Sequence, residues 1–267
     1  MDRNKRYADG MGWRVYLLLI GVSMLTGCRD DNSLILFHAG AVDVARSPNG
    51  RYWECPSIPV TPHRFYRIVF HSRTACASHW TAVFRDAAGQ ILAADHDSGI
   101  IPSGEWAETV CFFQAKEGAA TVCLRIHAAD AAKRPVPEIR ELSIAPASHA
   151  AVRAWSDRMY ATMPPIAYTP PMDRWDNLPT TRKKLLAGEP LRIVLLGDSI
   201  ANDIGNSSFE LLLHDDYPRS RITVITSIRG GTGCVYYQER DRVREYVTAF
   251  QPDLVMILGI SHGHDLN

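Results

Sequence analysis

The stretch Leu191-Arg192-Ile193-Val194-Leu195-Leu196-Gly197-Asp198-Ser199 decides the fold of the C-terminal third of the chain. It begins with an almost continuous apolar run, which is typical of a parallel strand buried on both faces. A glycine, an aspartate and a serine follow, and the residues after them favour a helix. In open α/β sheets, sites form beyond the carboxyl ends of the strands. The stretch therefore predicts a buried strand whose end carries the Ser199 hydroxyl toward a cleft.

Strand and helix signals alternate after this stretch. They predict a helix, a strand, an amphipathic helix and a second buried strand, at Ser207–Asp215, Arg221–Thr226, Gln238–Phe250 and Leu254–Leu258. This order is the front half of a doubly wound parallel sheet. Such sheets usually have about five strands, and no helix signal follows the last predicted strand. We therefore expect residues 191–267 to form an incomplete α/β domain, as in a truncated gene product or gene fragment.

Polar or glycine-rich segments follow the other two strands as well. They are Arg229-Gly230-Gly231-Thr232-Gly233 and Gly259-Ile260-Ser261-His262-Gly263-His264-Asp265. Glycines let a backbone approach a ligand closely, and a helix N-terminus offers N–H groups to an oxyanion. The same segments also suit a helix cap at Ser199, a flexible turn and a polar tail. A P-loop is absent and no GxGxxG motif follows the first strand, which argues against phosphate or dinucleotide binding.

Together the three strand ends resemble the SGNH/GDSL family of serine hydrolases. Gly197-Asp198-Ser199 matches the first block of that family, which implies Ser199 as the nucleophile and Asp198 as a supporting residue. The second block implies that the N–H of Gly230 or Gly231 joins the N–H of Ser199 in an oxyanion hole. The resemblance also implies a flavodoxin-like fold, an ester substrate, and neither a metal nor a cofactor.

Two departures from the family pattern bear on activity. The third block normally supplies an asparagine to the oxyanion hole, and here Ser261 or His262 takes that position. The last block, a DxxH that supplies a histidine base and its aspartate, does not occur before Asn267. A serine hydroxyl is a weak nucleophile without a base, so we expect impaired hydrolysis unless His262 or His264 serves. The alternative is a non-catalytic glycan-binding protein with a vestigial hydrolase segment.

Residues 34–147 carry the signals of an all-β, jelly-roll-like sandwich. Short runs rich in aromatic and β-branched residues alternate with turn signals. The predicted strands are Leu34–Phe37, Arg51–Cys55, Phe65–Ser72, Trp80–Arg85, Ile91–Ala94, Trp106–Phe113, Ala120–Ile126 and Glu138–Ile144. Residues 148–190 read as a proline-rich linker with short helices at Ala150–Tyr160 and Leu178–Ala187. The chain therefore predicts two domains joined by this linker.

A sandwich before such a hydrolase resembles the galactose-binding-like, carbohydrate-binding modules. The resemblance lies in Tyr66-Arg67-Ile68-Val69-Phe70 and in the run from Trp80 to Gly89. Trp53, Trp80 and Trp106 are candidates for stacking on sugar rings, and the alternative is that they are core residues. With the hydrolase resemblance, this implies an acylated carbohydrate or another small ester as the substrate.

The N-terminal residues read as an export signal. Four basic residues flank or precede an apolar run of 11 residues, Val15–Leu25, which is too short to span a bilayer. Leu25-Thr26-Gly27-Cys28 resembles a bacterial lipobox, which implies acylation of Cys28 and a membrane anchor. Arg at residue 29, where Asp would favour inner-membrane retention, implies an outer-membrane lipoprotein with a periplasmic or cell-surface face. Removing residues 1–27 takes away four basic and two acidic residues, so the formal net charge changes from 0 to −2. Nothing in this balance suggests a nucleic-acid partner.

Five further cysteines remain, and four of them lie in the predicted sandwich. They are Cys55, Cys76, Cys111 and Cys123, with Cys234 in the α/β segment. Export permits disulfides, and buried free thiols are the alternative. The sequence leaves both open.

Overall fold

The computed structural model describes residues 37–39, 45–46, 52–128, 136–165 and 167–259. The predicted signal peptide, Cys28 and the residues from Ile260 onward lie outside this part of the chain. Within it, no helix is long and apolar enough to cross a membrane.

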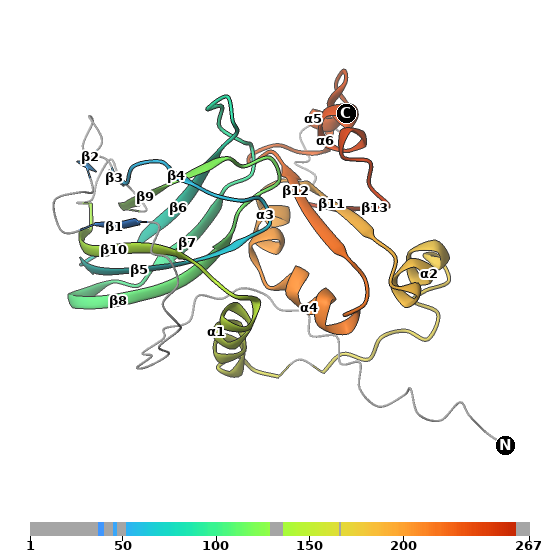
Figure 1. Ribbon diagram of the computed structural model, residues 1–267, viewed down its shortest axis with the longest axis horizontal. Coiled ribbons are helices and arrows are strands. Elements are labelled where there is room, and N and C mark those ends of the chain that lie inside the picture. The colour runs from blue at the N-terminus through green and yellow to red at the C-terminus, as the bar shows by residue number, and fades with distance from the viewer. Residues whose placement is uncertain (1–36, 40–44, 47–51, 129–135, 166, 260–267) are drawn as a thin grey trace.

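Two antiparallel sheets form the N-terminal part (Figure 1). The first has the order β1-β10-β5-β8, with bounds Phe37–Ala39, Glu138–Pro146, Phe65–Thr74 and Ser103–Gln114. The second has the order β2-β3-β9-β6-β7, with bounds Ala45–Arg46, Tyr52–Glu54, Thr121–Ala128, Ser78–Arg85 and His96–Ile100. A short strand β4, Ile58–Pro59, also pairs with β9.

The two sheets enclose one apolar core, which confirms the predicted β-sandwich. Alternate residues of β5 point inward, and Ile68 and Phe70 are fully buried. They share a cluster with Trp80 and Phe84 of the opposite sheet. Burial of each such side chain stabilises the fold by about 1.5–3 kcal/mol.

One predicted strand is wrong. Ile91–Ala94 makes a single isolated bridge, from Ile91 to Arg85, and the strand is instead β7, His96–Ile100. The physical reason is that Ala94, at the end of this segment, is buried in a cluster with Ala201 and Ile228 of the C-terminal part. Ala94 therefore contributes to a contact between the two parts, whereas Leu92 packs against the sandwich core.

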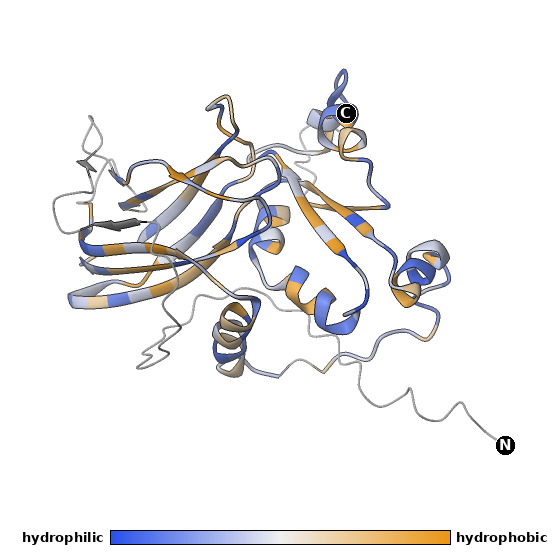
Figure 2. Cartoon of the chain, in the orientation of Figure 1, coloured by the Kyte–Doolittle hydropathy of each residue, from blue (hydrophilic) through white to orange (hydrophobic). Residues whose placement is uncertain are grey.

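The C-terminal part holds a parallel sheet with the order β12-β11-β13. Its strands are Ile222–Ile228, Leu191–Gly197 and Leu254–Leu258, close to the predicted bounds. The helices around it are α2, α3 and α4, at Pro179–Ala187, Ser199–Asn206 and Phe209–Asp216. Figure 2 shows hydrophobic residues concentrated along β11 and β12, as expected for buried parallel strands.

The predicted amphipathic helix Gln238–Phe250 is also wrong. The segment forms three short pieces, α5, α6 and the 3₁₀ helix η1, at Cys234–Gln238, Arg242–Tyr246 and Thr248–Phe250. Arg240 adopts a positive φ of 44°, which interrupts the helix between α5 and α6. As a result Val243 is 51% exposed, while Tyr246 packs with Tyr237 against Leu196.

Helix α1, His149–Ala161, packs the two parts together. Val152 on this helix shares a cluster with Phe65 and Phe112 of the sandwich and with Leu211 of α4. The Ser156 and Ser208 hydroxyls are hydrogen-bonded across the same junction. The predicted linker helices are therefore present, and α1 is a packed element rather than a spacer.

Candidate active site at the carboxyl edge of the parallel sheet

Ser199 is the first residue of α3, directly after the central strand β11. The buried Asp198 caps the helix, because its carboxylate accepts a hydrogen bond from the Ile200 N–H at 2.9 Å. Ser199 itself is exposed. The sequence therefore folds so that a hydroxyl stands at a helix N-terminus, where unpaired N–H groups favour negative charge.

Two glycines bring the ends of β11 and β13 into close contact. A Cβ at Gly197 would lie 1.6 Å from the carbonyl oxygen of Leu258, so only glycine fits there. A Cβ at Gly259 would lie 3.1 Å from both carboxylate oxygens of Asp198. The backbone after β13 thus lies directly against the capping carboxylate beside Ser199.

Tyr237 fixes the glycine-rich loop that follows β12. Its hydroxyl donates to the carbonyl oxygen of Gly197 at 2.5 Å and accepts from the Arg229 N–H at 2.8 Å. Burial is the main cause that raises the pKa of the Tyr237 phenol, so the hydroxyl keeps its proton at neutral pH. Beyond this anchor, Gly230 and Gly231 are exposed with open space around them, and Gly231 has a φ of 71°.

The structure thus brings Ser199, Asp198 and the Gly230-Gly231 loop to one edge of the sheet. Ser261 and His262, the predicted third oxyanion donors, lie outside the described residues. Among the described residues, none forms a hydrogen bond with the Ser199 hydroxyl. No group of His, Cys, Asp or Glu suited to a metal occurs within these ranges either.

A buried polar cluster lies at the other end of α3, and sequence reasoning missed it. Lys116 is 6% exposed, and its Nζ donates to Oδ1 of Asn206, the last residue of α3, at 2.6 Å. Burial lowers the pKa of Lys116 to about 8 and raises the pKa of nearby Asp95 to about 6. The sequence showed Lys116 only as part of a turn signal, where a lysine is ordinarily exposed.

A cavity of about 860 Å³ adjoins this cluster. Its walls include three tryptophans, Trp80, Trp106 and Trp155. Its polar lining includes Asp97, Gln114 and Asn206. The site therefore combines aromatic surface with carboxylate and amide groups, in a space large enough for a small organic ligand.

The three tryptophans singled out in the sequence have different surroundings. Trp80 is a core residue, 1% exposed, with its ring stacked on His96 at a centroid distance of 5.0 Å. Trp53 is half-buried and donates to the Pro137 carbonyl oxygen. Trp106 is half-buried too, with the Arg140 guanidinium 4.3 Å from its ring centre. Trp80 therefore follows the core alternative, and Trp106 is the tryptophan outside the core that also lines the cavity.

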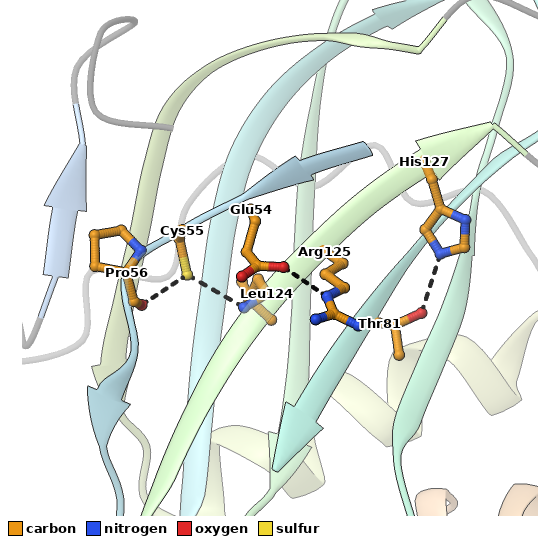
Figure 3. Close-up of polar contacts among 7 residues, drawn as sticks. All are labelled: Glu54, Cys55, Pro56, Thr81, Leu124, Arg125 and His127. Carbon is orange, nitrogen blue, oxygen red and sulfur yellow. Dashed lines mark hydrogen bonds and ion pairs between the residues drawn. The ribbon is translucent and has the colours of Figure 1, made fainter. Parts of the chain in front are cut away.

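None of the five described cysteines forms a disulfide, so the structure favours the second of the two alternatives. Figure 3 shows one of them between the strands, where Cys55 Sγ accepts from the Leu124 N–H at 3.2 Å and donates to the Pro56 carbonyl oxygen at 3.3 Å. Burial raises the pKa of this thiol to about 12, which makes it unreactive.

Comparisons with known proteins give structural likenesses only. No family model and no curated protein matches the sequence. Among solved structures, the enzymatically active domain of bacteriophage CBA120 tailspike protein 4 has 12% identity and a TM-score of 0.32, over 36% of this chain and 14% of that one. The CBM22-1 xylan-binding domain of Paenibacillus barcinonensis Xyn10C has 14% identity and a TM-score of 0.29, over 43% and 95%. The carbohydrate-binding module CBM6cm-2 of Cellvibrio mixtus lichenase 5A has 10% identity and a TM-score of 0.29, over 43% and 100%. Likenesses of this size do not assign a ligand to this chain.

Proposed function

We propose that the chain carries the nucleophile and oxyanion side of a serine ester-hydrolase site of SGNH/GDSL type. The observation that carries this proposal is the placement of Ser199. Its exposed side chain stands at the N-terminus of α3, and the Gly230-Gly231 loop is fixed to the same strand end through Tyr237. An acyl-transfer site needs a nucleophile and backbone donors in this relation.

In the proposed reaction, Ser199 Oγ attacks the ester carbonyl carbon and loses its proton to a base. The N–H groups of Ser199 and of Gly230 or Gly231 stabilise the negative charge on the carbonyl oxygen. The alcohol then leaves with a proton, and water hydrolyses the acyl-serine bond to release the acid. His262 and His264 follow β13 in the sequence and are the candidate bases within this chain.

The proposed substrate is an acylated carbohydrate or another small ester. The proposed setting is the periplasmic or cell-surface face of an outer membrane, with the chain anchored through a lipid on Cys28. Both proposals rest on the sequence patterns alone. Mass spectrometry of Cys28 in membrane fractions tests the anchor, because an acylated N-terminal peptide and an unmodified one differ in mass.

The hydrolase proposal is tested on protein from residue 29 onward with p-nitrophenyl acetate. We expect Ser199→Ala to abolish hydrolysis above the buffer rate, whereas Ser57→Ala, at an exposed serine of the sandwich, leaves it unchanged. Equal rates for wild type and Ser199→Ala would contradict the proposal for this chain. Loss in Ser199→Ala would next direct attention to His262→Ala and His264→Ala.

Carbohydrate binding by the sandwich is the second candidate function, and the cavity favours it. Trp106 lines the cavity with Asp97 and Gln114, so an aromatic ring and polar side chains face the same space. Such a combination suits a sugar, which has apolar faces and a rim of hydroxyls. This candidate is compatible with the first, because the cavity lies at the Asn206 end of α3 and Ser199 at the other end, so the two sites do not overlap.

The test is titration with soluble oligosaccharides, monitored by tryptophan fluorescence. We expect Trp106→Ala to weaken binding by at least tenfold, and Trp53→Ala, outside the cavity lining, to leave it unchanged. No saturable signal with any oligosaccharide would argue against this candidate.

A further inference from the structure

The sandwich holds the C-terminal end of α3 through two side-chain contacts. Lys116, in the turn between β8 and β9, donates from Nζ to Asn206 Oδ1 at 2.6 Å. The Nδ2 of Asn206 donates to the carbonyl oxygen of Asp95 at 3.4 Å. The last residue of the helix is therefore clamped between two segments of the sandwich.

The rest of α3 is enclosed on other sides. Ala201, two residues after Ser199, is fully buried and shares a cluster with Ala94 of the sandwich and Ile228 of β12. A Cβ at Gly205 would lie 2.3 Å from the Thr226 Oγ1, so this turn of the helix rests directly on β12. The helix is thus packed against the sandwich and β12 along its length, and the two Asn206 contacts hold its last residue.

A lysine at this place is an unusual choice. Lysines are almost never fully buried unless they are paired, and the carboxylates that act on Lys116 are Asp95, Glu210 and Asp97. None of them has a recorded hydrogen bond to its ammonium group, whereas Asn206 does. The contact that Lys116 makes is therefore directed at the helix.

We propose that Lys116 is a positioning residue for Ser199, so that the sandwich is a working part of the catalytic site and not a separate module. The inference rests on the proposed function, in which Ser199 reacts at the N-terminus of α3. The helix has eight residues and is about 12 Å long at 1.5 Å per residue. A shift along it is transmitted directly to the nucleophile, and a displacement of about 1 Å is enough to slow a reaction about 100-fold.

A thiol in place of the Ser199 hydroxyl tests the positioning without depending on catalysis. The background is Ser199→Cys with Cys234→Ser, which removes the exposed native thiol. A thiol at a helix N-terminus has a lowered pKa. Its pKa and its access to reagent also depend on the strand ends and the loop that face it, which do not move with α3, so its alkylation rate against pH reports how the helix end is placed against them. Iodoacetamide labelling is followed at position 199 by mass spectrometry.

In this background we expect Lys116→Met to raise the pKa of the introduced thiol and to slow its alkylation at pH 7 by about threefold or more. The matched control is Lys184→Met. Lys184 also makes a 2.6 Å contact, to Asp253, but at the opposite edge of the sheet, so its loss should leave the thiol unchanged. An unchanged thiol pKa in folded Lys116→Met, or an equal change in both variants, would overturn the proposal.

A second variant keeps the test decisive if Lys116→Met does not fold. Lys116→Met with Asn206→Leu replaces both partners of the 2.6 Å contact by apolar groups, and only the carbonyl oxygen of Asp95 loses a donor. The pKa of the thiol at position 199 should rise, and its alkylation should slow, in this variant as well. If the thiol responds but wild-type protein shows no Ser199-dependent hydrolysis, the proposed function fails and the positioning stands. If wild-type protein shows Ser199-dependent hydrolysis but the pKa of the thiol does not change in the variants, the proposed function stands and the positioning role of Lys116 fails.

Discussion

The hydroxyl of Tyr237 lies 2.5 Å from the carbonyl oxygen of Gly197 and donates a hydrogen bond to it. The same hydroxyl accepts the backbone N–H of Arg229 at 2.8 Å, so one phenol joins the end of β11 to the start of the glycine-rich loop. A direct bond from the Arg229 N–H to the Gly197 carbonyl, at 3.1 Å, completes this triangle. The loop that is proposed to hold the oxyanion is thereby fixed relative to Ser199.

Removing this hydroxyl should loosen the loop. We expect Tyr237→Phe to lower the free energy of unfolding by about 1–2 kcal/mol, because two hydrogen bonds are lost while the ring packing remains. Urea denaturation measures the effect. Tyr236→Phe is the control, since the Tyr236 hydroxyl bonds only the Tyr246 hydroxyl among described partners, and it should lose under 1 kcal/mol. A larger loss in Tyr236→Phe than in Tyr237→Phe would contradict the assigned role.

Two glycines of the site should differ strongly in their tolerance of alanine. Gly197→Ala places a Cβ 1.6 Å from the Leu258 carbonyl oxygen, so β13 must move, and we expect destabilisation by about 3 kcal/mol or more. Gly230→Ala meets nothing within 4 Å and should change stability by under about 0.5 kcal/mol. Thermal unfolding of both variants checks the pair, and a tolerated Gly197→Ala would mean that β13 does not pack as described.

The strands of the parallel sheet were predictable because their apolar runs are bounded by glycine, proline or charged residues. Leu254–Leu258 has the bounds of β13, and the Leu191–Leu196 run lies within β11. The exposed Ser199 after β11 follows from local sequence in the same way, but the alternative of a helix cap at Ser199 is wrong, because Asp198 caps α3. Local patterns decide such elements, and tertiary contacts do not override them.

Other features depend on contacts between distant segments and gave no local signal. Ile91–Ala94 looks like a strand, but Ala94 packs on Ala201, which lies far along the chain. Lys116 looks like a turn residue, and only the fold brings Asn206 to its ammonium group. The apolar spacing of Gln238–Phe250 fits a helix, yet the positive φ of Arg240 breaks it. The contacts that are proposed to position Ser199 could therefore not be predicted from the sequence.

His96 should make the fold sensitive to acid. Burial, and then Lys116, lowers the pKa of His96 to about 3, against an ordinary value of 6.5. Between these two values the unfolded chain binds the proton and the folded protein does not, so stability falls as pH drops through 6.5 toward 3. We expect the His96 contribution to reduce the free energy of unfolding by about 3 kcal/mol between pH 7 and pH 4.

His96→Phe keeps a ring against Trp80 and removes this titration, so its stability should fall less than that of wild type between pH 7 and pH 4. Urea denaturation at both pH values measures the difference. Asp95→Asn should have the opposite effect, so the stability of this variant should fall more than that of wild type between pH 7 and pH 4. The pKa of Asp95 is raised, mainly by burial, to about 6 from 3.8, so its protonation favours the folded state as pH falls between these values. A parallel pH dependence in wild type and His96→Phe would show that His96 is not buried as described.

The thiols should react in an order set by their burial. Cys234 is exposed and Cys76 is partly buried, whereas Cys55, Cys111 and Cys123 are buried and free. Burial raises the pKa of all three buried thiols, so few thiolates form at neutral pH. With protein from residue 29 onward, we expect a disulfide reagent to label Cys234 fast, Cys76 more slowly and the other three only after denaturation. Cys234→Ser should remove the fast phase. Fewer than five thiols in denaturant without reductant would show that the protein forms a disulfide, against the structure.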